Sequence, residues 1–324
     1  MKGSVHVIVK SKKVQFSFQL NRNITIIRGD SATGKTTLVE MIRQYSMQGV
    51  ASGIQVICEK ECVAPEGSIR DLTNIVEISE RIIFLDENTS YLKSDEFARI
   101  IEKSDNYFVL VTRESLNNLP YSVKEIYQIH ESGKYKNLQT VYNEFERIYD
   151  ESMISEPLCS DTIITEDSNT GYELYQKLTE NSQIACVSAN GKSNVKNKIF
   201  ECVRQGNKVL AIVDGAAFGA DMEAVVNIIE KVGSAKIWAP ESFEYLILQS
   251  GIFKQSKKCK DMLSSPGEFI ESQEYFSWER FFVDFLEQET EQTMFKYNKR
   301  KLNSAYYTPI ALNKFKESIH WSLF

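Results

Sequence analysis

The sequence predicts an α/β protein made of two successive domains. Three observations support this fold class. A glycine-rich loop at residues 29–36 joins an apolar run to a helix-like stretch, short apolar runs end in acids at Asp86, Glu166 and Asp214, and strand–helix alternation starts again after residue 160. A chain of 324 residues has room for two domains of ordinary size. We expect them at residues 1–150 and 160–265, followed by a helical C-terminal region at residues 266–324.

The glycine-rich loop reads Gly-Asp-Ser-Ala-Thr-Gly-Lys-Thr and matches the pattern G-x-x-x-x-G-K-[ST] at every position. The apolar run Ile24–Ile27 predicts a strand before it, and residues 37–42 predict a helix after it, which is the setting that this motif needs. Backbone N–H groups and the helix N-terminus then surround the phosphates of ATP. Lys35 would neutralise phosphate charge and Thr36 would bind Mg²⁺. The predicted nucleotide-binding residues of the loop are Gly29, Asp30, Ser31, Ala32, Thr33, Gly34, Lys35, Thr36 and Thr37.

A second signal is the apolar run at residues 82–85, which ends in Asp86 and Glu87. Four apolar residues before two acids predict a buried parallel strand with carboxylates at its C-terminal end. We expect Asp86 to hold Mg²⁺ and Glu87 to act as the general base that polarises the attacking water. Another strand is predicted at residues 108–112, directly before Arg113.

The order of these segments resembles an ABC-type ATPase over roughly residues 1–140. The resemblance rests on the glycine-rich loop, Leu85–Ser90, Val111–Glu114 and Ile126–Ile129. Such ATPases usually carry L-D-E-P-T-S and V-T-H-D at the second and third of these places. Here Asn88 replaces the proline and Arg113 replaces the switch histidine.

No L-S-G-G-Q signature is recognisable between residues 37 and 82. We therefore do not expect the standard head-to-tail ATP sandwich of ABC proteins. Arg113 has two open interpretations: a sensor of the γ-phosphate, and hence a nucleotide-binding residue, or a surface arginine in a salt bridge.

The second half predicts four strands, at residues 163–165, 184–187, 209–213 and 236–238. Two of them end in acids, at Glu166 and Asp214. Mg²⁺ prefers oxygen ligands and typically takes one or two carboxylates together with water and phosphate. These two acids are therefore the candidate catalytic residues and metal ligands of a site that activates water or orients a phosphodiester.

This arrangement resembles the Toprim domain of topoisomerases, primases and OLD-family nucleases. That domain has a glutamate after its first strand, matched by Glu166, and an Asp-x-Asp after its third, whose first aspartate is matched by Asp214. Ala216 stands where the second aspartate belongs, and Asp221 or Glu223 are the nearest substitutes. An alternative interpretation is a degenerate second nucleotide-binding fold, because residues 191–193 read Gly-Lys-Ser before a predicted helix; the same residues could instead form a turn near the metal site.

The C-terminal region has two notable patterns. The aromatic side chains Trp278, Phe281, Phe282 and Phe285 recur at a spacing that predicts a helix with a buried face. Residues 296–301 read Lys-Tyr-Asn-Lys-Arg-Lys, which indicates either a nucleic-acid contact with base stacking or a solvated helix face.

Bulk properties restrict the class of protein. The net charge of −6 argues against a strongly basic nucleic-acid binder. No apolar run approaches the roughly 18 residues of a membrane span, so we expect a cytoplasmic protein without a membrane partner. Six scattered cysteines indicate reduced, mostly structural thiols.

The pairing of the two halves resembles OLD-type proteins and the ATPase–Toprim partners of bacterial anti-phage systems. The resemblance implies that ATP binding gates a metal-dependent cleavage of nucleic acid, in phage defence or mobile-element biology. The alternative is a catalytically degenerate second domain in an ATP-dependent switch or scaffold, which would recruit a protein partner or assemble with copies of itself.

Overall fold

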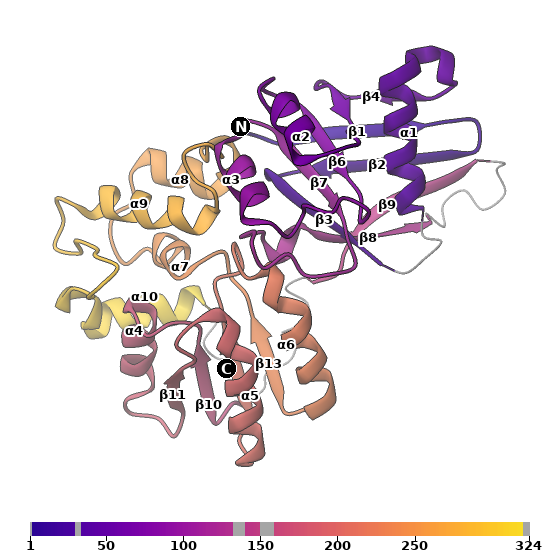
Figure 1. The fold of residues 1–324 in the computed structure, drawn as a ribbon. Helices are drawn as coiled ribbons and strands as arrows, with labels where there is room; N and C mark the ends of the chain where they lie inside the picture. The colour runs from indigo at the N-terminus through magenta and orange to yellow at the C-terminus, as the bar shows by residue number, and fades with distance from the viewer. Residues whose placement is uncertain (1, 30–33, 132–139, 150–158, 320–324) are drawn as a thin grey trace. The chain divides into compact units, whose positions relative to one another are not determined.

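The computed structural model describes residues 2–29, 34–131, 140–149 and 159–319. The chain divides into two compact units, Met1–Ile148 with Gly267–Phe276 and Tyr149–Pro266 with Ser277–Phe324. Each unit contains its own β-sheet (Figure 1), which confirms the α/β fold class at the level of a mixed α/β protein. The stretch expected to separate the domains, residues 152–160, lies almost entirely outside the described residues.

The first unit contains a mixed sheet in which nine described strands are ordered β4-β1-β2-β9-β8-β3-β7-β6-β5. These strands are β1 (Val5–Lys10), β2 (Val14–Leu20), β3 (Ile24–Arg28), β4 (Gln55–Ile57), β5 (Cys62–Val63), β6 (Ile82–Leu85), β7 (Tyr107–Val111), β8 (Ile126–Glu131) and β9 (Val141–Arg147). Strands β8, β3, β7, β6 and β5 run parallel to one another. Outside this block the pairing is mixed: β1 is antiparallel to β2 and β4, and β9 is antiparallel to β8.

Burial explains why the parallel strands read as continuous apolar runs. Every residue of β3, β6 and β7 is buried, whereas β1 alternates between buried and more exposed positions. The helical segments of this unit are α1 (Lys35–Gln48), η1 (Gly49–Ser52), α2 (Ile69–Val76), α3 (Asp95–Lys103) and η2 (Val123–Glu125). Helix α1 lies against the sheet (Figure 1), where it packs on β1, β4, β5 and β6 and contributes one buried face to the core of the unit.

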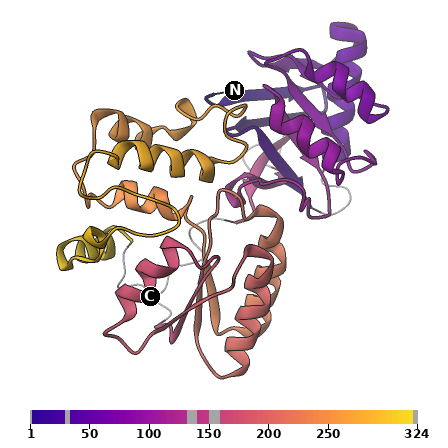
Figure 2. The ribbon, with the colours of Figure 1, turned by 60° about the vertical axis from the view of Figure 1, so that its left-hand side comes forward.

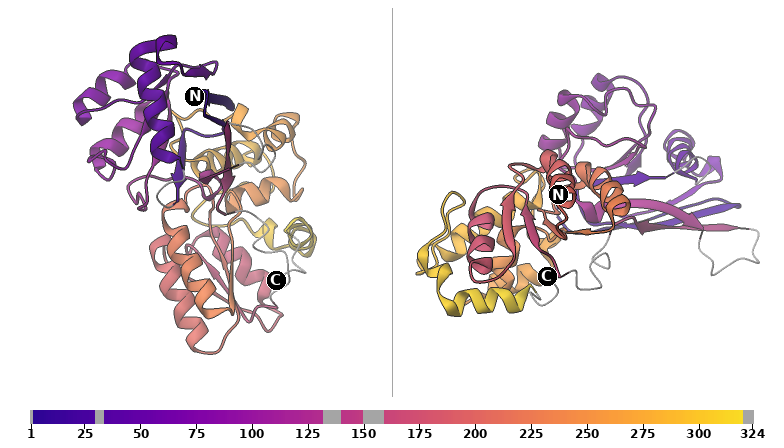
Figure 3. Two further views of the ribbon diagram at one scale, coloured as in Figure 1. Left: turned by 90° about the vertical axis from the view of Figure 1, so that its right-hand side faces the viewer. Right: turned by 90° about the horizontal axis from the view of Figure 1, so that it is seen from below.

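The second unit contains a sheet of four described parallel strands in the order β11-β10-β12-β13. They are β10 (Thr162–Thr165), β11 (Ala185–Ser188), β12 (Val209–Ile212) and β13 (Ala235–Trp238), close to the predicted positions. The connecting helical segments are α4 (Thr170–Thr179), η5 (Lys192–Asn194), α5 (Val195–Arg204) and α6 (Gly219–Val232). Helices α5 and α6 pack together beside β10, β12 and β13, while α4 packs against β11 (Figures 2 and 3).

The C-terminal region is helical, as predicted, but its first residues belong to the other unit. Residues 267–276 pack with the first unit, where the Gly3 N–H donates to the Gly267 carbonyl at 2.8 Å. The remaining helical segments are α7 (Phe243–Gln249), α8 (Lys257–Ser264), η6 (Pro266–Glu268), α9 (Trp278–Thr290), η7 (Ser304–Tyr307) and α10 (Pro309–Ser318). Helices α9 and α10 both contact α7.

The aromatic pattern in α9 is confirmed as a buried helix face, because Phe281, Phe282 and Phe285 are buried. Two parts of the interpretation of residues 296–301 are corrected. These residues form no helix, so they are not a solvated helix face. Tyr297 is only 2% exposed, so its ring is not free to stack on a base. Within the described residues, no helix is both long and apolar enough to span a membrane.

Candidate functional site

The glycine-rich loop lies between β3 and α1, at the carboxyl end of the parallel block. Gly29 and Gly34 have φ angles of +123° and +84°, in the region that favours glycine. A Cβ on Gly34 would also lie 3.4 Å from two ring atoms of Phe16. The N–H of Leu38 donates to the Gly34 carbonyl at 2.9 Å and begins the hydrogen bonding of α1. Asp30, Ser31, Ala32 and Thr33 lie outside the described residues.

The lysine and threonines of the motif occupy the first turn of α1. Lys35 is 5% exposed, and its ammonium group donates a hydrogen bond to the Gly29 carbonyl across the loop. Thr36 and Thr37 are at the start of the helix, where Thr37 is exposed. Hydroxyl oxygen is a suitable donor for Mg²⁺, so this end of α1 fits the expected Mg²⁺–ATP chemistry.

Strand register brings the other predicted nucleotide residues to the same edge of the sheet. Strand β7 lies between β3 and β6, with Ile27 opposite Val111 and Leu85 opposite Leu110. The carboxyl ends of these three parallel strands therefore lie side by side. The glycine-rich loop, Arg113 and the Asp86–Glu87 pair leave the sheet there.

Two ion pairs organise these side chains. Nε of Arg113 lies 3.1 Å from Oε2 of Glu87, and the two side chains are 53% and 37% exposed. Asp86 is less exposed, and its Oδ2 lies 3.7 Å from Nη2 of Arg43. Arg113 thus has the salt bridge of its second interpretation, and its partner is the predicted general base.

Arg43 was not among the predicted site residues. It lies on α1 and also pairs with Glu40 at 2.7 Å and Glu66 at 2.9 Å. The sequence spacing could have identified it, because Arg43 is seven residues after Thr36 and therefore lies on the same face of α1. Thr36 and the ion-pair partner of Arg43, Asp86, are both predicted Mg²⁺ ligands.

The candidate site of the second unit lies where the strand order reverses. From β10 the chain forms β11 on one side and then crosses to β12 on the other side, so the crevice between β10 and β12 is a topological switch point. Glu166 directly follows β10, and Asp214 lies two residues after β12. The two predicted carboxylates are therefore brought together at the position where doubly wound sheets bind ligands.

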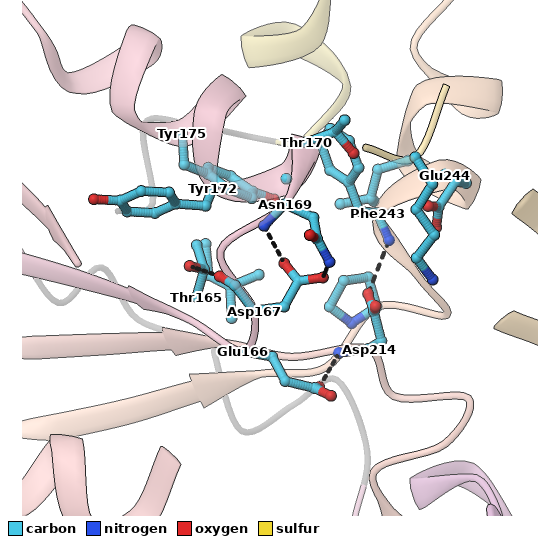
Figure 4. Close-up of a pocket in the computed structure, with 15 residues that line it drawn as sticks. Thr165, Glu166, Asp167, Asn169, Thr170, Tyr172, Tyr175, Asp214, Phe243 and Glu244 are labelled. Atoms are coloured by element: carbon cyan, nitrogen blue, oxygen red, sulfur yellow. Dashed lines mark hydrogen bonds between the residues drawn. The ribbon is translucent and has the colours of Figure 1, made fainter. Parts of the chain in front are cut away.

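Backbone hydrogen bonds fix both carboxylates. The N–H of Asp214 donates to Oε2 of Glu166 at 3.1 Å, and the N–H of Phe243 donates to Oδ1 of Asp214 at 2.9 Å (Figure 4). The N–H of Gly191 donates to the carbonyl of Glu166 at 2.7 Å. Residues 191–193 thus form a turn beside Glu166, as the second interpretation of the Gly-Lys-Ser segment expected.

Both carboxyl groups hold their protons more tightly than usual. Burial, with smaller contributions from the charges of Glu279 and Asp167, raises the pKa of Glu166 to about 7, although the Asp214 N–H and Lys192 oppose the shift. Burial likewise raises the pKa of Asp214 well above its ordinary value, and nearby acids, Glu279 and Glu166 first, reinforce the effect. A pair of acids that resists ionisation in this way is typical of a site that binds cations or transfers protons.

A pocket surrounds the acidic pair, and part of its lining was missed by the sequence analysis. Its walls include Tyr175, Phe243, Glu244 and Lys299. Oε2 of Glu244 and Oη of Tyr175 are buried and have no hydrogen-bond partner among the described residues. The ammonium group of Lys299 lies 2.9 Å from a carboxylate oxygen of Glu279. No local pattern marks Phe243, Glu244 or Lys299, because they come from helices and turns far along the chain.

The position of the absent second aspartate is buried, because Ala216 is 2% exposed. The residue before it, Gly215, has no room for a side chain, since a Cβ there would lie 2.5 Å from the Ala239 carbonyl oxygen. Asp221 is in the first turn of α6, and neither it nor Glu223 lines the pocket. Across the described residues, no group of three or more His, Cys, Asp or Glu side chains is placed to hold one metal ion. Glu166 and Asp214 can thus offer a cation two carboxylates, with water and a ligand oxygen needed to complete its coordination.

No protein-family model matches the chain, and no curated protein resembles it significantly in sequence.

Proposed function

We propose that this chain binds and hydrolyses ATP in its first unit and cleaves a nucleic-acid phosphodiester in its second unit with the help of a divalent metal ion. The observation that supports the second activity is the meeting of Glu166 and Asp214 at the switch point between β10 and β12, joined by a 3.1 Å hydrogen bond. Open parallel sheets bind their ligands in this crevice. Oxygen-only donors favour Mg²⁺ or Mn²⁺ over softer metals.

The metal ion would supply Lewis-acid stabilisation of the phosphate and activation of water. Glu166 and Asp214 would hold the ion, and Lys299, which lines the same pocket, would bring positive charge near the phosphate. The raised pKa of both carboxyl groups, which burial causes first, agrees with this role, because a bound cation would stabilise their ionised forms.

The support for ATP binding is the geometry at the start of α1. Gly34 has the positive φ that the loop needs, Lys35 and Thr36 follow on the first helical turn, and Asp86 leaves the same edge of the sheet. Backbone N–H groups at such a helix N-terminus bind phosphate. Because Glu87 and Arg113 are paired at that edge, they are the residues proposed to act on the γ-phosphate.

The test is a cleavage assay on plasmid DNA, single-stranded DNA and tRNA with Mn²⁺ or Mg²⁺, with and without ATP. We expect cleavage by the wild type and its loss in Glu166→Ala and Asp214→Ala. Glu180→Ala is the matched control, because Glu180 is an exposed acid of the same unit at the end of α4, outside the pocket. Intact substrates under all metal and nucleotide conditions, with ATP binding verified in the same preparation, would contradict the nuclease proposal.

A second candidate is an ATP-dependent switch or scaffold that captures a protein partner or a second copy of the chain. It is favoured by Ala216, a buried residue without a carboxylate, which stands where the second aspartate of the motif belongs. In that case the mass of the assembly would change with ATP, Lys35→Met would abolish the change, and Glu166→Ala would preserve it. Light scattering on the three proteins separates this function from the nuclease.

A further inference from the structure

Two cysteines face each other across a tight turn of the first unit. Cys58 follows β4, and Cys62 is the first residue of β5. The N–H of Lys60 donates to the sulfur of Cys58 at 3.4 Å, and the thiol of Cys62 donates to the carbonyl of Lys60 at 3.8 Å. Both sulfurs therefore lie beside the same residue, and each thiol influences the pKa of the other.

The two thiols differ in the way that a reactive pair requires. Cys58 is only partly buried, whereas Cys62 is 5% exposed and packs in the hydrophobic core. Both are free thiols. A reactive cysteine needs an accessible sulfur, and a sensor needs a resolving cysteine beside it.

The pKa values of the two thiols also differ. The hydrogen bond from Cys62 lowers the pKa of the Cys58 thiol to about 7, against the opposing effect of its partial burial. The Lys60 N–H and side-chain charge also favour the thiolate, and the charge of Glu59 disfavours it. The pKa of Cys62 is raised, with Cys58 and burial as its main causes, so Cys62 stays protonated. Near neutral pH, Cys58 is thus the nucleophile of the pair.

From this geometry we infer that Cys58 and Cys62 form a redox-active dithiol, which a hydroperoxide converts to an intramolecular disulfide. The Cys58 thiolate attacks one peroxide oxygen, the O–O bond breaks, and Cys58 becomes a sulfenic acid while the other oxygen leaves and takes a proton. The Cys62 sulfur then attacks the Cys58 sulfur, loses its proton and displaces water. Two electrons pass from the sulfurs to the peroxide, and a thiol reductant reverses the change.

The disulfide would act on the helix that follows the glycine-rich loop. A covalent bond between the two sulfurs requires the Cys62 thiol to give up its present hydrogen bonds. Cys62 shares the core with Leu38 and Ile42 of α1, and its carbonyl accepts a 3.2 Å hydrogen bond from the hydroxyl of Ser46 on the same helix. Oxidation therefore shifts the packing of α1, and ATP affinity changes at least threefold; this last effect rests on the proposed ATP binding.

The disulfide itself is tested without nucleotide. The full chain is treated with hydrogen peroxide, remaining thiols are alkylated, and trypsin digestion is carried out without reductant. Trypsin cuts after Lys60, between the two cysteines, so Cys58 lies in peptide 44–60 and Cys62 in peptide 61–70. We expect these peptides to stay joined until a reductant is added, and to separate in Cys58→Ser and Cys62→Ser.

Cys159→Ser is the control, because Cys159 is an exposed thiol elsewhere in the chain. It should give the joined peptides as the wild type does, and in the untreated wild type Cys58 should be alkylated faster than Cys159. The inference is overturned if peroxide leaves the two peptides separate, or if it oxidises Cys58 to the sulfinic acid without joining it to Cys62. A joined pair with unchanged ATP affinity would overturn the coupling to α1 but would leave the proposed ATPase intact.

Discussion

The backbone N–H of Asp214 donates a 3.1 Å hydrogen bond to a carboxylate oxygen of Glu166, a residue 48 positions earlier in the chain. This bond holds two acids at the adjacent ends of β10 and β12. One peptide group stabilises the ionised form of Glu166, yet it does not offset the burial that raises the pKa of that residue to about 7. The pair is therefore arranged at a cost in folding free energy, which is typical of a functional site rather than of a stabilising one.

That cost gives a pH-dependent prediction for Glu166→Gln. The unfolded chain loses the Glu166 proton near the ordinary glutamate pKa of 4.5, whereas the folded chain keeps it until about 7. The unfolded state binds fewer protons in this range, so the wild type loses stability as the pH rises from about 4.5 to about 7, by at most about 3 kcal/mol. Glutamine keeps an acceptor for the Asp214 N–H but does not ionise. In urea unfolding, the free energy of unfolding of the variant minus that of the wild type should be more negative at pH 5 than at pH 8.

Glu180→Gln serves as the comparison, because Glu180 is exposed and lies outside the pocket. Its free energy of unfolding should follow the wild type at both pH values. Parallel pH profiles for Glu166→Gln and the wild type would show that Glu166 titrates normally in the folded protein.

Metal binding should release the protons of Glu166 and Asp214. Because the pKa of Glu166 is raised to about 7 and that of Asp214 is raised as well, a divalent cation must displace protons to bind at lower pH. We expect Mn²⁺ to bind more tightly at pH 8 than at pH 6. Calorimetry in two buffers of different ionisation enthalpy measures the proton release directly. In Asp214→Asn this signal should disappear, and an unchanged signal in that variant would place the metal elsewhere.

At the glycine-rich loop, Lys35→Met should weaken ATP binding by about 10- to 100-fold, because a charge-assisted hydrogen bond contributes about 1.5–3 kcal/mol. Lys103→Met is the matched control, since Lys103 lies at the end of α3, away from the loop in the sequence. Fluorescence titration with an ATP analogue measures both, and circular dichroism checks that the variants fold. Equal affinity in the two variants would mean that Lys35 does not contact the nucleotide.

Substitution of Arg113, which pairs with Glu87, distinguishes a γ-phosphate sensor from a surface arginine in a salt bridge. Both side chains are well exposed, at 53% and 37%, so their ion pair contributes less than about 1 kcal/mol to stability. Arg113→Ala should therefore unfold at nearly the wild-type urea concentration and yet lose at least tenfold in the rate of phosphate release from ATP. Arg99→Ala, a change on α3, is the matched control and should leave the rate of phosphate release unaltered. If Arg113→Ala hydrolyses ATP at the wild-type rate, Arg113 is only a surface arginine.

Short apolar runs that end in an acid were the sequence pattern that best predicted the structure. They located β6, β10 and β12, because parallel strands that are buried on both faces contain almost only apolar residues until they leave the sheet. Strand β9 was missed, since Val141–Arg147 lies at the mixed side of the sheet and is mostly polar, with one fully buried position. Its position depends on pairing with β2 and β8, which no local pattern records.

The residues of the candidate site in the second unit also include some that the sequence predicted and some that it did not. Glu166 and Asp214 could be predicted from their strands, and topology then places them together. Glu244 and Lys299 could not be predicted, because each reaches the pocket through tertiary packing of the region after β13. Base stacking by Tyr297 requires an exposed ring, yet the ring is buried among the residues that follow α9.

Tyr297 provides the last prediction, because it links the C-terminal region to the pocket. Its hydroxyl donates a 2.7 Å hydrogen bond to Oε1 of Glu244 and lies 2.8 Å from the hydroxyl of Thr170. The other oxygen of Glu244, Oε2, has no partner among the described residues, so Tyr297→Phe removes a hydrogen bond that a buried carboxyl group cannot replace from its described neighbours. The expected loss is about 1–3 kcal/mol of unfolding free energy in urea. Tyr172→Phe is the control, because its hydroxyl bonds to Gln176 in an exposed position, and its change should stay within about 0.5 kcal/mol. If both variants unfold at the same urea concentration, the C-terminal region does not hold the pocket in place through this hydroxyl.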